Sequence, residues 1–380
     1  MADPLDTLRL PATPVAPDPA FRARLRARLE AATDPACPVA LDTETTDLTP
    51  FRAELVGIGL CWGEGPADLA YIPIGHHPAT PSGSDAGADG ATPDLFAEAR
   101  YQPTAARFIL PAPAGTPKNW AAYRARFVEP RRVKAGVAFW NENEAWLRQA
   151  QREYGVPPEI IVGLLGVETL YGRDMGRFRI LDALVTLGFD FPANAPRDRS
   201  AYFRNELEQY YLLCRDIHAN PLEINSSYAG AVGLPQFMPS SWRKYAVDFD
   251  GDGRIDLIHS PADAIGSVAH YLAEFGWTRD MPNYYSIRTL PAPGDDLTRL
   301  LAPDIVPSFT PEEMEQLGAK LSPQGLQHEG LLALVKLENG NDAPTYVAGT
   351  DNFYAITRYN QSSPYAMAVI ELGKAIAQAR

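Results

Sequence analysis

A carboxyl group held among apolar neighbours is suited to acid–base chemistry, and Glu168 has such a position. A predicted helix ends at Gly172, and within it Leu164, Leu165 and Glu168 follow Ile161 at i+3, i+4 and i+7. On this apolar stripe a carboxyl is costly to ionise, so its pKa rises and it can hold the proton needed to protonate a glycosidic oxygen. The same pattern also fits a solvated glutamate at a frayed helix end, and the helix alone leaves both interpretations open.

A glycine-rich loop is the second segment that could contribute to a site. Residues 227–241 read SYAGAVGLPQFMPSS. Small residues let the backbone pass close to a ligand, and Gln236 offers a neutral donor and acceptor beside it. Pro239 and Ser240 suit a stop followed by a helix cap. Most such loops are only turns, so this one does not identify a site by itself.

An acidic loop has the spacing of a calcium ligand set. Residues 248–256 read DFDGDGRID and match the first nine positions of an EF-hand loop. Position 12 is His259 rather than a bidentate carboxylate, and the nearest later carboxylate is Asp263. We expect a structural Ca²⁺ site, because three carboxylates this close repel one another without a cation; the alternative is an Asx-rich turn. The expected ligands are Asp248, Asp250, Asp252, Arg254 and Asp263.

The N-terminal part carries a different metal-binding pattern. Asp42 and Glu44 lie two apart on a predicted strand, so both face the same side and could ligate one metal ion. With their flanks they resemble the 3′–5′ exonuclease domain of DNA polymerase I, over about residues 18–77. Two-metal cleavage needs further carboxylates from later segments, and the chain changes character before they arrive. We interpret this part as a truncated α/β fragment with vestigial carboxylates, inactive as a nuclease.

These residues lie in three predicted parts. Residues 1–77 form the exonuclease-like fragment, 78–94 form a linker rich in Pro, Ala and Gly, and 95–380 form a mainly helical region. One helix is expected to open at Pro158. Others are expected at 132–154, 199–217, 240–247, 263–274 and 364–379. The predicted class is mainly α (α+β), preceded by the small α/β piece.

The composition excludes some classes of protein. Of the 380 residues, 46% are hydrophobic and 21% are charged, and no apolar run is long enough to span a bilayer. The net charge of −13 argues against a polyanion binder, so we expect no nucleic-acid partner. The three cysteines make neither a disulfide framework nor a metal-ligand pattern. Residues 1–10 do not resemble a signal peptide, and no early cysteine could carry a lipid, so no membrane anchor is expected.

From about residue 95 to its end, the chain resembles the membrane-bound lytic murein transglycosylase B family, which has a lysozyme-like fold. The matching segments occur in the same order over this whole stretch, which leaves little room for chance. They are residues 120–124 (WAAYR), 136–140 (GVAFW), 166–173 (GVETLYGR), 179–184 (RILDAL), 236–241 (QFMPSS), 357–360 (TRYN) and 365–369 (YAMAV).

The resemblance implies cleavage of the MurNAc–GlcNAc β-1,4 bond of peptidoglycan without water. Glu168 would protonate the leaving oxygen and then act as base on the C6 hydroxyl of the same MurNAc, closing a 1,6-anhydro ring. The substrate's own hydroxyl and N-acetyl group would replace the second carboxylate of other glycosidases. Ser227 and Gln236 would contact sugar near the scissile bond. The implied cleft-lining residues are Tyr123, Tyr271, Tyr359, Asn360 and Tyr365.

The resemblance also implies glycan strands as the partner, a periplasmic location and a calcium loop longer than the EF-hand, although the chain shows no export address. Two departures limit it. Val232 stands where a Met is expected, and residues 193–200 look longer than in the family, so Arg197 and Arg199 are not assigned to sugar binding. A non-catalytic peptidoglycan-binding module remains an alternative, but it would need Glu168 to be lost or misplaced. A metal-dependent exonuclease is disfavoured by its missing carboxylates.

Overall fold

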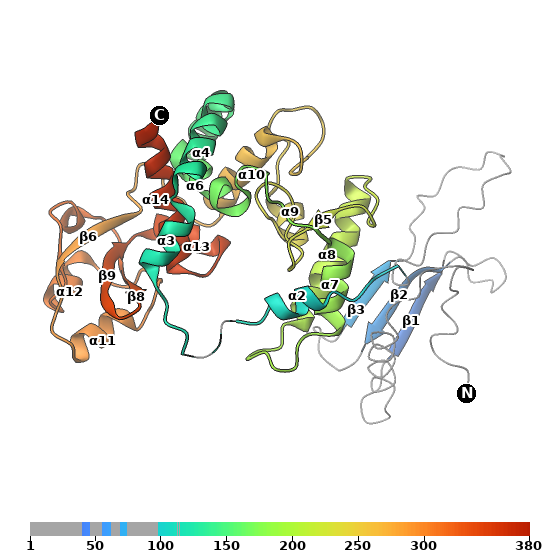
Figure 1. Cartoon of the computed structure of the whole chain (residues 1–380), viewed down its shortest axis with the longest axis horizontal. Coiled ribbons are helices and arrows are strands. Elements are labelled where there is room, and N and C mark those ends of the chain that lie inside the picture. Colours follow the sequence, from blue (N-terminus) through green and yellow to red (C-terminus); the bar gives the residue numbers. More distant parts are fainter. Residues whose placement is uncertain (1–39, 46–54, 62–68, 74–97, 112, 114) are drawn as a thin grey trace. The chain divides into compact units, whose positions relative to one another are not determined.

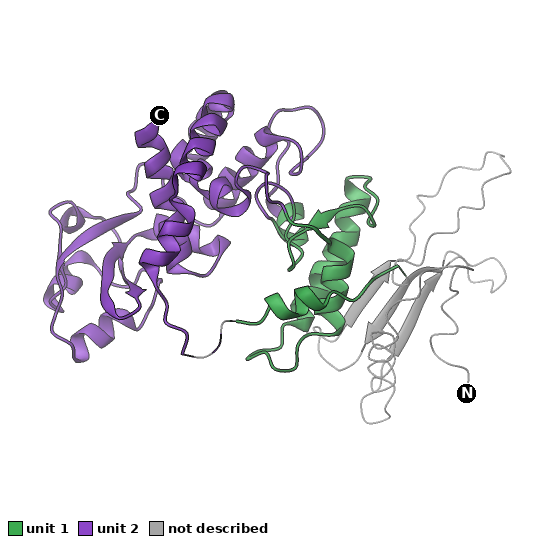
Figure 2. Cartoon of the chain, viewed as in Figure 1, with its two compact units in different colours: residues 1–111, 176–232, 237–243 green, residues 112–175, 233–236, 244–380 purple. Residues whose placement is uncertain are grey.

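The computed structural model describes residues 40–45, 55–61, 69–73, 98–111, 113 and 115–380, the first three ranges by their backbone alone (Figure 1). The chain divides into two compact units, each assembled from separate stretches of sequence (Figure 2). The first unit takes residues 1–111, 176–232 and 237–243, and the second takes 112–175, 233–236 and 244–380. The predicted linker at 78–94 lies outside the described residues, and the predicted domain boundaries stay predictions.

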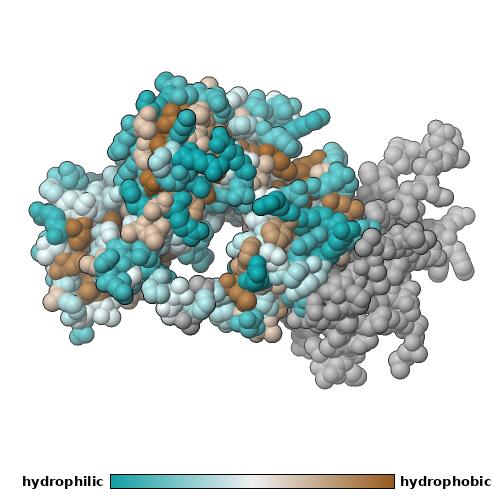
Figure 3. All heavy atoms as spheres, in the orientation of Figure 1, coloured by the Kyte–Doolittle hydropathy of each residue, from teal (hydrophilic) through white to brown (hydrophobic). Residues whose placement is uncertain are grey.

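Figure 3 shows one face of the described part of the chain. On the face seen in Figure 3, hydrophilic residues predominate and hydrophobic areas lie between them. Within this part of the chain, no helix combines the length and apolar character that crossing a bilayer requires.

Among the described residues of the first unit, three antiparallel strands come before α2 (Pro103–Phe108). They are β1 (Ala40–Thr45), β2 (Leu55–Cys61) and β3 (Leu69–Pro73), and β1 confirms the strand predicted at Asp42 and Glu44. Asp42 and Glu44 lie on β1, paired with Gly59 and Gly57 of β2, and their side chains are outside the description. The remaining elements are α2 (Pro103–Phe108), β4 (Phe178–Arg179), α7 (Ile180–Phe189), α8 (Ser200–Asp216), β5 (Asn225–Ser226) and the start of α9 (Pro239–Tyr245).

The second unit contains the helix that carries Glu168, α6 (Pro158–Thr169), in its core. Pro158 lies in the first turn, where its missing N–H leaves no helical bond unmade. Ten of the twelve residues are buried, so α6 is apolar on every side rather than on one stripe. This unit also contains the helices α3 (Trp120–Phe127), α4 (Pro130–Glu142), α5 (Glu144–Tyr154), α10 (Pro261–Glu274), α13 (Asp351–Tyr359) and α14 (Ser363–Ala379).

Helix α6 packs most closely against α14, and two glycines set the distance between them. A Cβ on Gly163 would lie 2.2 Å from the carbonyl oxygen of Val369, and one on Gly373 would lie 2.1 Å from that of Glu159. Neither position therefore accepts a larger side chain without separating the two helices. This close contact brings the C-terminal half of α6 against the start of α14.

The second unit also contains an antiparallel sheet that the sequence analysis did not predict. Its strand order is β7 (Lys320–Leu321), β6 (Tyr284–Thr289), β9 (Asp342–Gly349) and β8 (Ala333–Asn339). Helices α11 (Asp295–Leu301) and α12 (Pro311–Gln316) and the 3₁₀ turn η2 (Gly325–Gln327) accompany it. The sheet has its own small hydrophobic core, which includes Leu300, Met314 and Leu334.

The predicted helices agree with the structure except that α6 ends at Thr169 instead of continuing to Gly172, and that one longer helix is divided. The predicted helix 132–154 is wrong, because the chain forms α4 and α5 with Asn143 between them. The Asn143 side chain donates a 2.9 Å hydrogen bond to the carbonyl of Phe139, and its backbone leaves the helical conformation. Asparagine side chains compete with the backbone in this way and favour helix ends. The predicted mainly helical class is confirmed.

Candidate active site

Glu168 lies one residue before the end of α6, and protein atoms surround its carboxyl closely. The side chain keeps some solvent exposure, while Leu164 and Leu165 on the preceding turn are fully buried. Desolvation disfavours the ionised form and raises the pKa of Glu168 to about 7. The carboxyl can therefore both release and accept a proton near neutral pH.

Tyr365 is the hydrogen-bond partner of this carboxyl. Its hydroxyl, on the first turn of α14, donates to Glu168 Oε1, and the tyrosine itself is 3% exposed. This bond favours the charged carboxylate and so opposes the effect of burial on the pKa of Glu168. Among the described residues, no hydrogen bond is made to Oε2. One oxygen is therefore held in place while the other is free to exchange a proton with a ligand.

A cluster of tyrosines surrounds the pair. The rings of Tyr359 and Tyr365 are nearly parallel, with centroids 6.4 Å apart, and Tyr271 meets Tyr359 at 4.9 Å in an edge arrangement. Burial raises the pKa of Tyr123, and the charge of Glu168 raises it further, which places Tyr123 near the carboxyl as well. The structure thus brings together Glu168 and four of the predicted cleft residues. Their roles in binding stay predictions.

Two further predicted residues belong to the same unit. Asn360 ends α13 and is exposed, and its side chain makes no hydrogen bond within the described part of the chain. Gln236 has a left-handed backbone, with φ 52°. Its Nε2 donates to the carbonyls of Gly233 at 2.9 Å and Met175 at 3.3 Å. Because those bonds use the amide nitrogen, the side-chain oxygen of Gln236 is left as the acceptor.

Ser227 belongs to the first unit, in the tight turn that follows β5. Its Oγ accepts from the backbone N–H of Ala231 at 3.1 Å and of Ala229 at 3.3 Å, and its own N–H donates to the Ala231 carbonyl at 2.8 Å. These bonds fix the side chain in the glycine-rich loop. Its role in sugar binding stays a prediction.

A second buried carboxyl, Glu206 of α8, was missed by the sequence analysis. It is 1% exposed, and burial raises its pKa. Its oxygens accept from the backbone N–H of Ser240 at 3.0 Å and from the Ser240 hydroxyl at 2.6 Å. Glu206 therefore accepts a hydrogen bond from a backbone N–H at the start of α9 that has no partner within the helix, and it holds Ser240 in place. Glu206 and Ser240 are 34 residues apart, and no local sequence pattern indicates that they are hydrogen-bonded.

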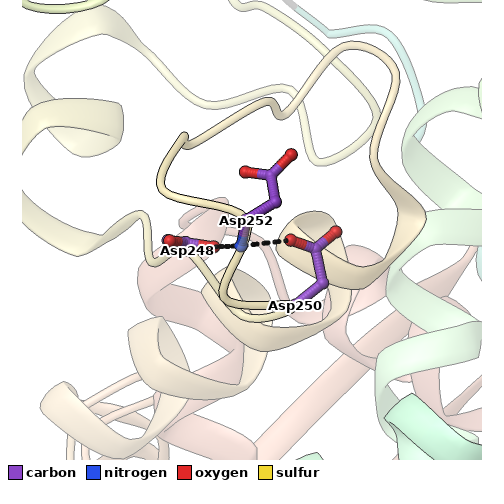
Figure 4. A group of neighbouring side chains, drawn as sticks. All are labelled: Asp248, Asp250 and Asp252. Carbon is purple, nitrogen blue, oxygen red and sulfur yellow. Dashed lines mark hydrogen bonds between the residues drawn. The ribbon is translucent and has the colours of Figure 1, made fainter.

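The acidic loop brings three carboxylates together (Figure 4). Oxygens of Asp248, Asp250 and Asp252 lie within 4.8 Å of one another. The backbone N–H groups of Gly251 and Gly253 donate to Asp248, each at 2.8 Å, which holds the loop in this shape. Oxygen ligands at such spacing suit a hard divalent cation.

The other two predicted ligands have different surroundings. Asp263 is 1% exposed, and its oxygens accept from the backbone N–H of Phe249 and of Asp256, both at 2.8 Å. Burial raises the pKa of Asp263, and the charges of Asp250 and Asp248 contribute to this. The Arg254 N–H donates to Asp252 at 2.8 Å, which leaves the Arg254 carbonyl as the group that could face a cation. The ligand roles of Asp263 and Arg254 stay predictions.

Comparison with known proteins places these features in context. The family model described as "Transglycosylase SLT domain" matches residues 81–374. The chain is 46% identical to the membrane-bound lytic murein transglycosylase B of Escherichia coli (strain K12) over 274 residues, which is 70% of each protein. A second match, to DNA polymerase I of a Synechocystis strain, is 58% identical but covers only 45 residues, 12% of this chain and 5% of that polymerase.

Solved structures with the same fold carry ligands. The E. coli lytic transglycosylase Slt35 was solved in complex with bulgecin A and also in complex with calcium. Each structure is 42% identical with a TM-score of 0.66 over 76% of this chain, and the match covers 87% and 86% of those chains. SltB3 from Pseudomonas aeruginosa was solved with NAG-NAM-pentapeptide. It is 28% identical with a TM-score of 0.61, over 74% of this chain and 73% of that one.

Proposed function

Because this chain belongs to the transglycosylase SLT domain family and is a lytic murein transglycosylase, we propose that it cuts peptidoglycan without water, with Glu168 as its single acid and base. The bond cleaved is the β-1,4 linkage from MurNAc to GlcNAc. The products are a GlcNAc 4-hydroxyl and a 1,6-anhydroMurNAc end.

The carboxyl of Glu168, with its pKa of about 7, carries this proposal. In the first step protonated Glu168 gives its proton to the glycosidic oxygen, and the bond from that oxygen to C1 of MurNAc breaks. The positive charge that develops at C1 is stabilised by the neighbouring N-acetyl group. In the second step the C6 hydroxyl attacks C1, and the carboxylate of Glu168 takes the hydroxyl proton. Glu168 is thereby restored, and no water is consumed.

Tyr365 and the tyrosines around it support both steps. By donating to Oε1, Tyr365 directs Oε2 toward the reacting oxygen and stabilises the carboxylate formed after the first proton transfer. Tyr123, Tyr271 and Tyr359 offer apolar ring faces to the sugar. The hydroxyls of Tyr271 and Tyr359 donate to the carbonyls of Arg358 and Pro235, so among these three only the Tyr123 hydroxyl is proposed to contact sugar. Gln236 and Asn360 supply polar side-chain atoms for the N-acetyl and hydroxyl groups.

The natural partner in this proposal is the peptidoglycan glycan strand, and the place of action is the periplasm. The ligands of the similar structures, bulgecin A and NAG-NAM-pentapeptide, support a glycan-binding cleft of this chemistry. The name of the E. coli relative, a membrane-bound murein enzyme, supports the location. The short polymerase match supports no nuclease function, because it covers too little of such an enzyme.

The acidic loop in this proposal holds one Ca²⁺ with a structural role. Asp248, Asp250 and Asp252 would supply carboxylate oxygens, Arg254 its backbone carbonyl, and Asp263 a further carboxylate. The calcium complex of Slt35 supports this assignment. The cation would offset the mutual repulsion of the carboxylates and fix the loop that precedes α10.

Mass spectrometry of digested, purified peptidoglycan tests the proposal. We expect 1,6-anhydro-muropeptides from the wild-type protein and none from Glu168→Gln. Glu159→Gln, at the other end of the same helix, is the matched control and should retain activity. Reducing-end products would instead indicate a muramidase that uses water. If the wild-type protein gives no product, the proposed activity is contradicted, and a non-catalytic peptidoglycan-binding module becomes the better interpretation.

A further inference from the structure

The backbone turns sharply directly after Glu168 and Thr169. Leu170, Tyr171 and Gly172 all have left-handed conformations, with φ of 50°, 60° and 82°. For the two residues that have a Cβ this conformation costs about 1–2 kcal/mol each, so it persists only where neighbouring groups enforce it. The turn fixes where α6 ends, and therefore where the carboxyl of Glu168 lies.

The hydroxyl of Thr169 holds the turn from inside, together with backbone hydrogen bonds such as that from Asp174 N–H to the Thr169 carbonyl at 2.9 Å. The Thr169 side chain is buried, with 1% exposure. Its Oγ1 accepts from the N–H of Gly172 at 2.9 Å and donates to the carbonyl of Leu234 at 2.9 Å. One hydroxyl thus closes the turn and also connects it to a segment 65 residues further along the chain.

The connected segment, residues 233–236, carries groups that the proposed reaction uses. Gln236 lies at its end and donates to the carbonyl of Met175, which follows the turn. The carbonyl of Pro235 accepts from the hydroxyl of Tyr359, a member of the tyrosine cluster. Thr169 therefore links the end of α6 directly to residues 233–236. This segment includes Gln236 and accepts the hydrogen bond from Tyr359.

Resting on the proposed role of Glu168, we propose that Thr169 is a positioning residue for the reaction. Its hydroxyl holds the acid on α6 in register with the 233–236 segment, so that the proton donor and the sugar-contacting groups meet the same glycosidic bond. Thr169 itself touches no substrate. Losing the hydroxyl would leave the Gly172 N–H and the Leu234 carbonyl without this partner and let the two segments shift.

Kinetics of Thr169→Val, which keeps the side-chain shape, test this assignment with soluble peptide-free glycan strands. A shift of about 1 Å in a reacting group lowers rates by up to about 100-fold. We expect kcat to fall about 10- to 100-fold with KM nearly unchanged. Thr169→Ser keeps the hydroxyl and should restore kcat to within about threefold of the wild type. Thr169→Ala replaces the valine variant if the latter does not fold.

The matched control is Thr186→Val in the first unit. Thr186 is also fully buried, and its Oγ1 accepts from the N–H of Gln102 at 2.9 Å. We expect this variant to lower Tm but leave kcat unchanged at 25 °C. Equal kcat losses in the two valine variants, or no rescue by serine, would overturn the positioning role. Product formation by Glu168→Gln would instead contradict the proposed function, so the two failures are distinguishable.

Discussion

Burial and Tyr365 act on Glu168 in opposite directions. Burial favours the protonated carboxyl, and the Tyr365 hydroxyl favours the carboxylate, with burial the larger effect. The balance leaves the pKa at about 7, where a single group can serve first as acid and then as base. In the proposed mechanism with Glu168 as the single acid and base, this balance determines the pH range of activity.

Tyr365→Phe tests the balance directly. The acid step needs a protonated Glu168, so the wild-type kcat/KM should decline as pH rises through about 7. Removing the hydroxyl removes the interaction that lowers the pKa, and the midpoint of this decline should move to higher pH. Tyr346→Phe, on β9, is the control and should keep the wild-type profile. A profile of Tyr365→Phe that moves to lower pH would contradict the assignment.

The raised pKa of Glu168 also has a consequence for stability. Below pH 4.5 the carboxyl is protonated in both the folded and the unfolded chain, so the free energy of unfolding does not depend on pH through this group. Between pH 4.5 and about 7 only the unfolded chain ionises, so the folded state loses stability as pH rises, by at most about 3 kcal/mol.

Glu168→Gln has no carboxyl to ionise, so it lacks the loss of stability that the wild type undergoes between pH 4.5 and about 7. We therefore expect the variant to have a higher Tm than the wild type at pH 8 and a similar Tm at pH 5, measured by calorimetry. Equal differences at both pH values would show that the carboxyl is not desolvated in the folded protein.

The sequence predicted the burial of Glu168 but not its partners. The apolar positions Ile161, Leu164 and Leu165 are buried as expected. Tyr365 lies 197 residues away, and helical spacing carries no information about contacts at that separation. The tyrosines near Glu168 were predicted only from the family resemblance. Thr169 and Glu206 were not predicted, because their importance follows from hydrogen bonds that the sequence does not show.

At the level of elements, the approach of α6 to α14 determines the distance between Glu168 and Tyr365, because each helix carries one of them. Gly163 and Gly373 make this approach possible, since each faces a backbone carbonyl of the other helix. Backbone atoms in a packed core cannot move aside as the end of a flexible side chain can.

Gly163→Ala should therefore reduce both stability and activity. Its Cβ would meet the Val369 carbonyl at 2.2 Å, and overpacking of this kind typically costs about 1–3 kcal/mol. We expect a lower midpoint in urea unfolding and a lower kcat, because the helices separate. Gly294→Ala is the control, since the nearest atom to its Cβ would be 3.9 Å away. A wild-type kcat in Gly163→Ala would show that the helix spacing does not matter for the reaction.

The elements themselves were predictable to different degrees. The helices predicted at 199–217, 263–274 and 364–379 match α8, α10 and α14 to within two residues of their observed ends. The four-stranded sheet was missed, because β8 is buried on consecutive residues rather than alternating ones. Pro344 lies inside β9, where a proline argues against a strand, and it sits where the pairing of β8 and β9 is irregular.

For the molecule as a whole, a cation bound only by the folded chain would raise its stability. At a free concentration 100 times Kd the gain is about 2.7 kcal/mol. We expect added Ca²⁺ to raise Tm and a chelator to lower it. Asp250→Asn should weaken this response, whereas Asp280→Asn should not, because Asp280 lies outside the acidic loop and asparagine tolerates its left-handed backbone, φ 61°. A Tm independent of Ca²⁺ would leave the loop as an Asx-rich turn.

The division of the chain into interleaved stretches limits how it can be recombined. Residues 233–236 are four positions of the second unit enclosed by two stretches of the first. Any exchange that replaces residues 176–243 as a block also replaces Gln236 and the carbonyl that Thr169 binds. A grafted segment from a relative must therefore supply its own version of these four residues, whereas an exchange upstream of residue 98 leaves all of them intact. Chimeras should thus tolerate new N-termini far more readily than a new middle.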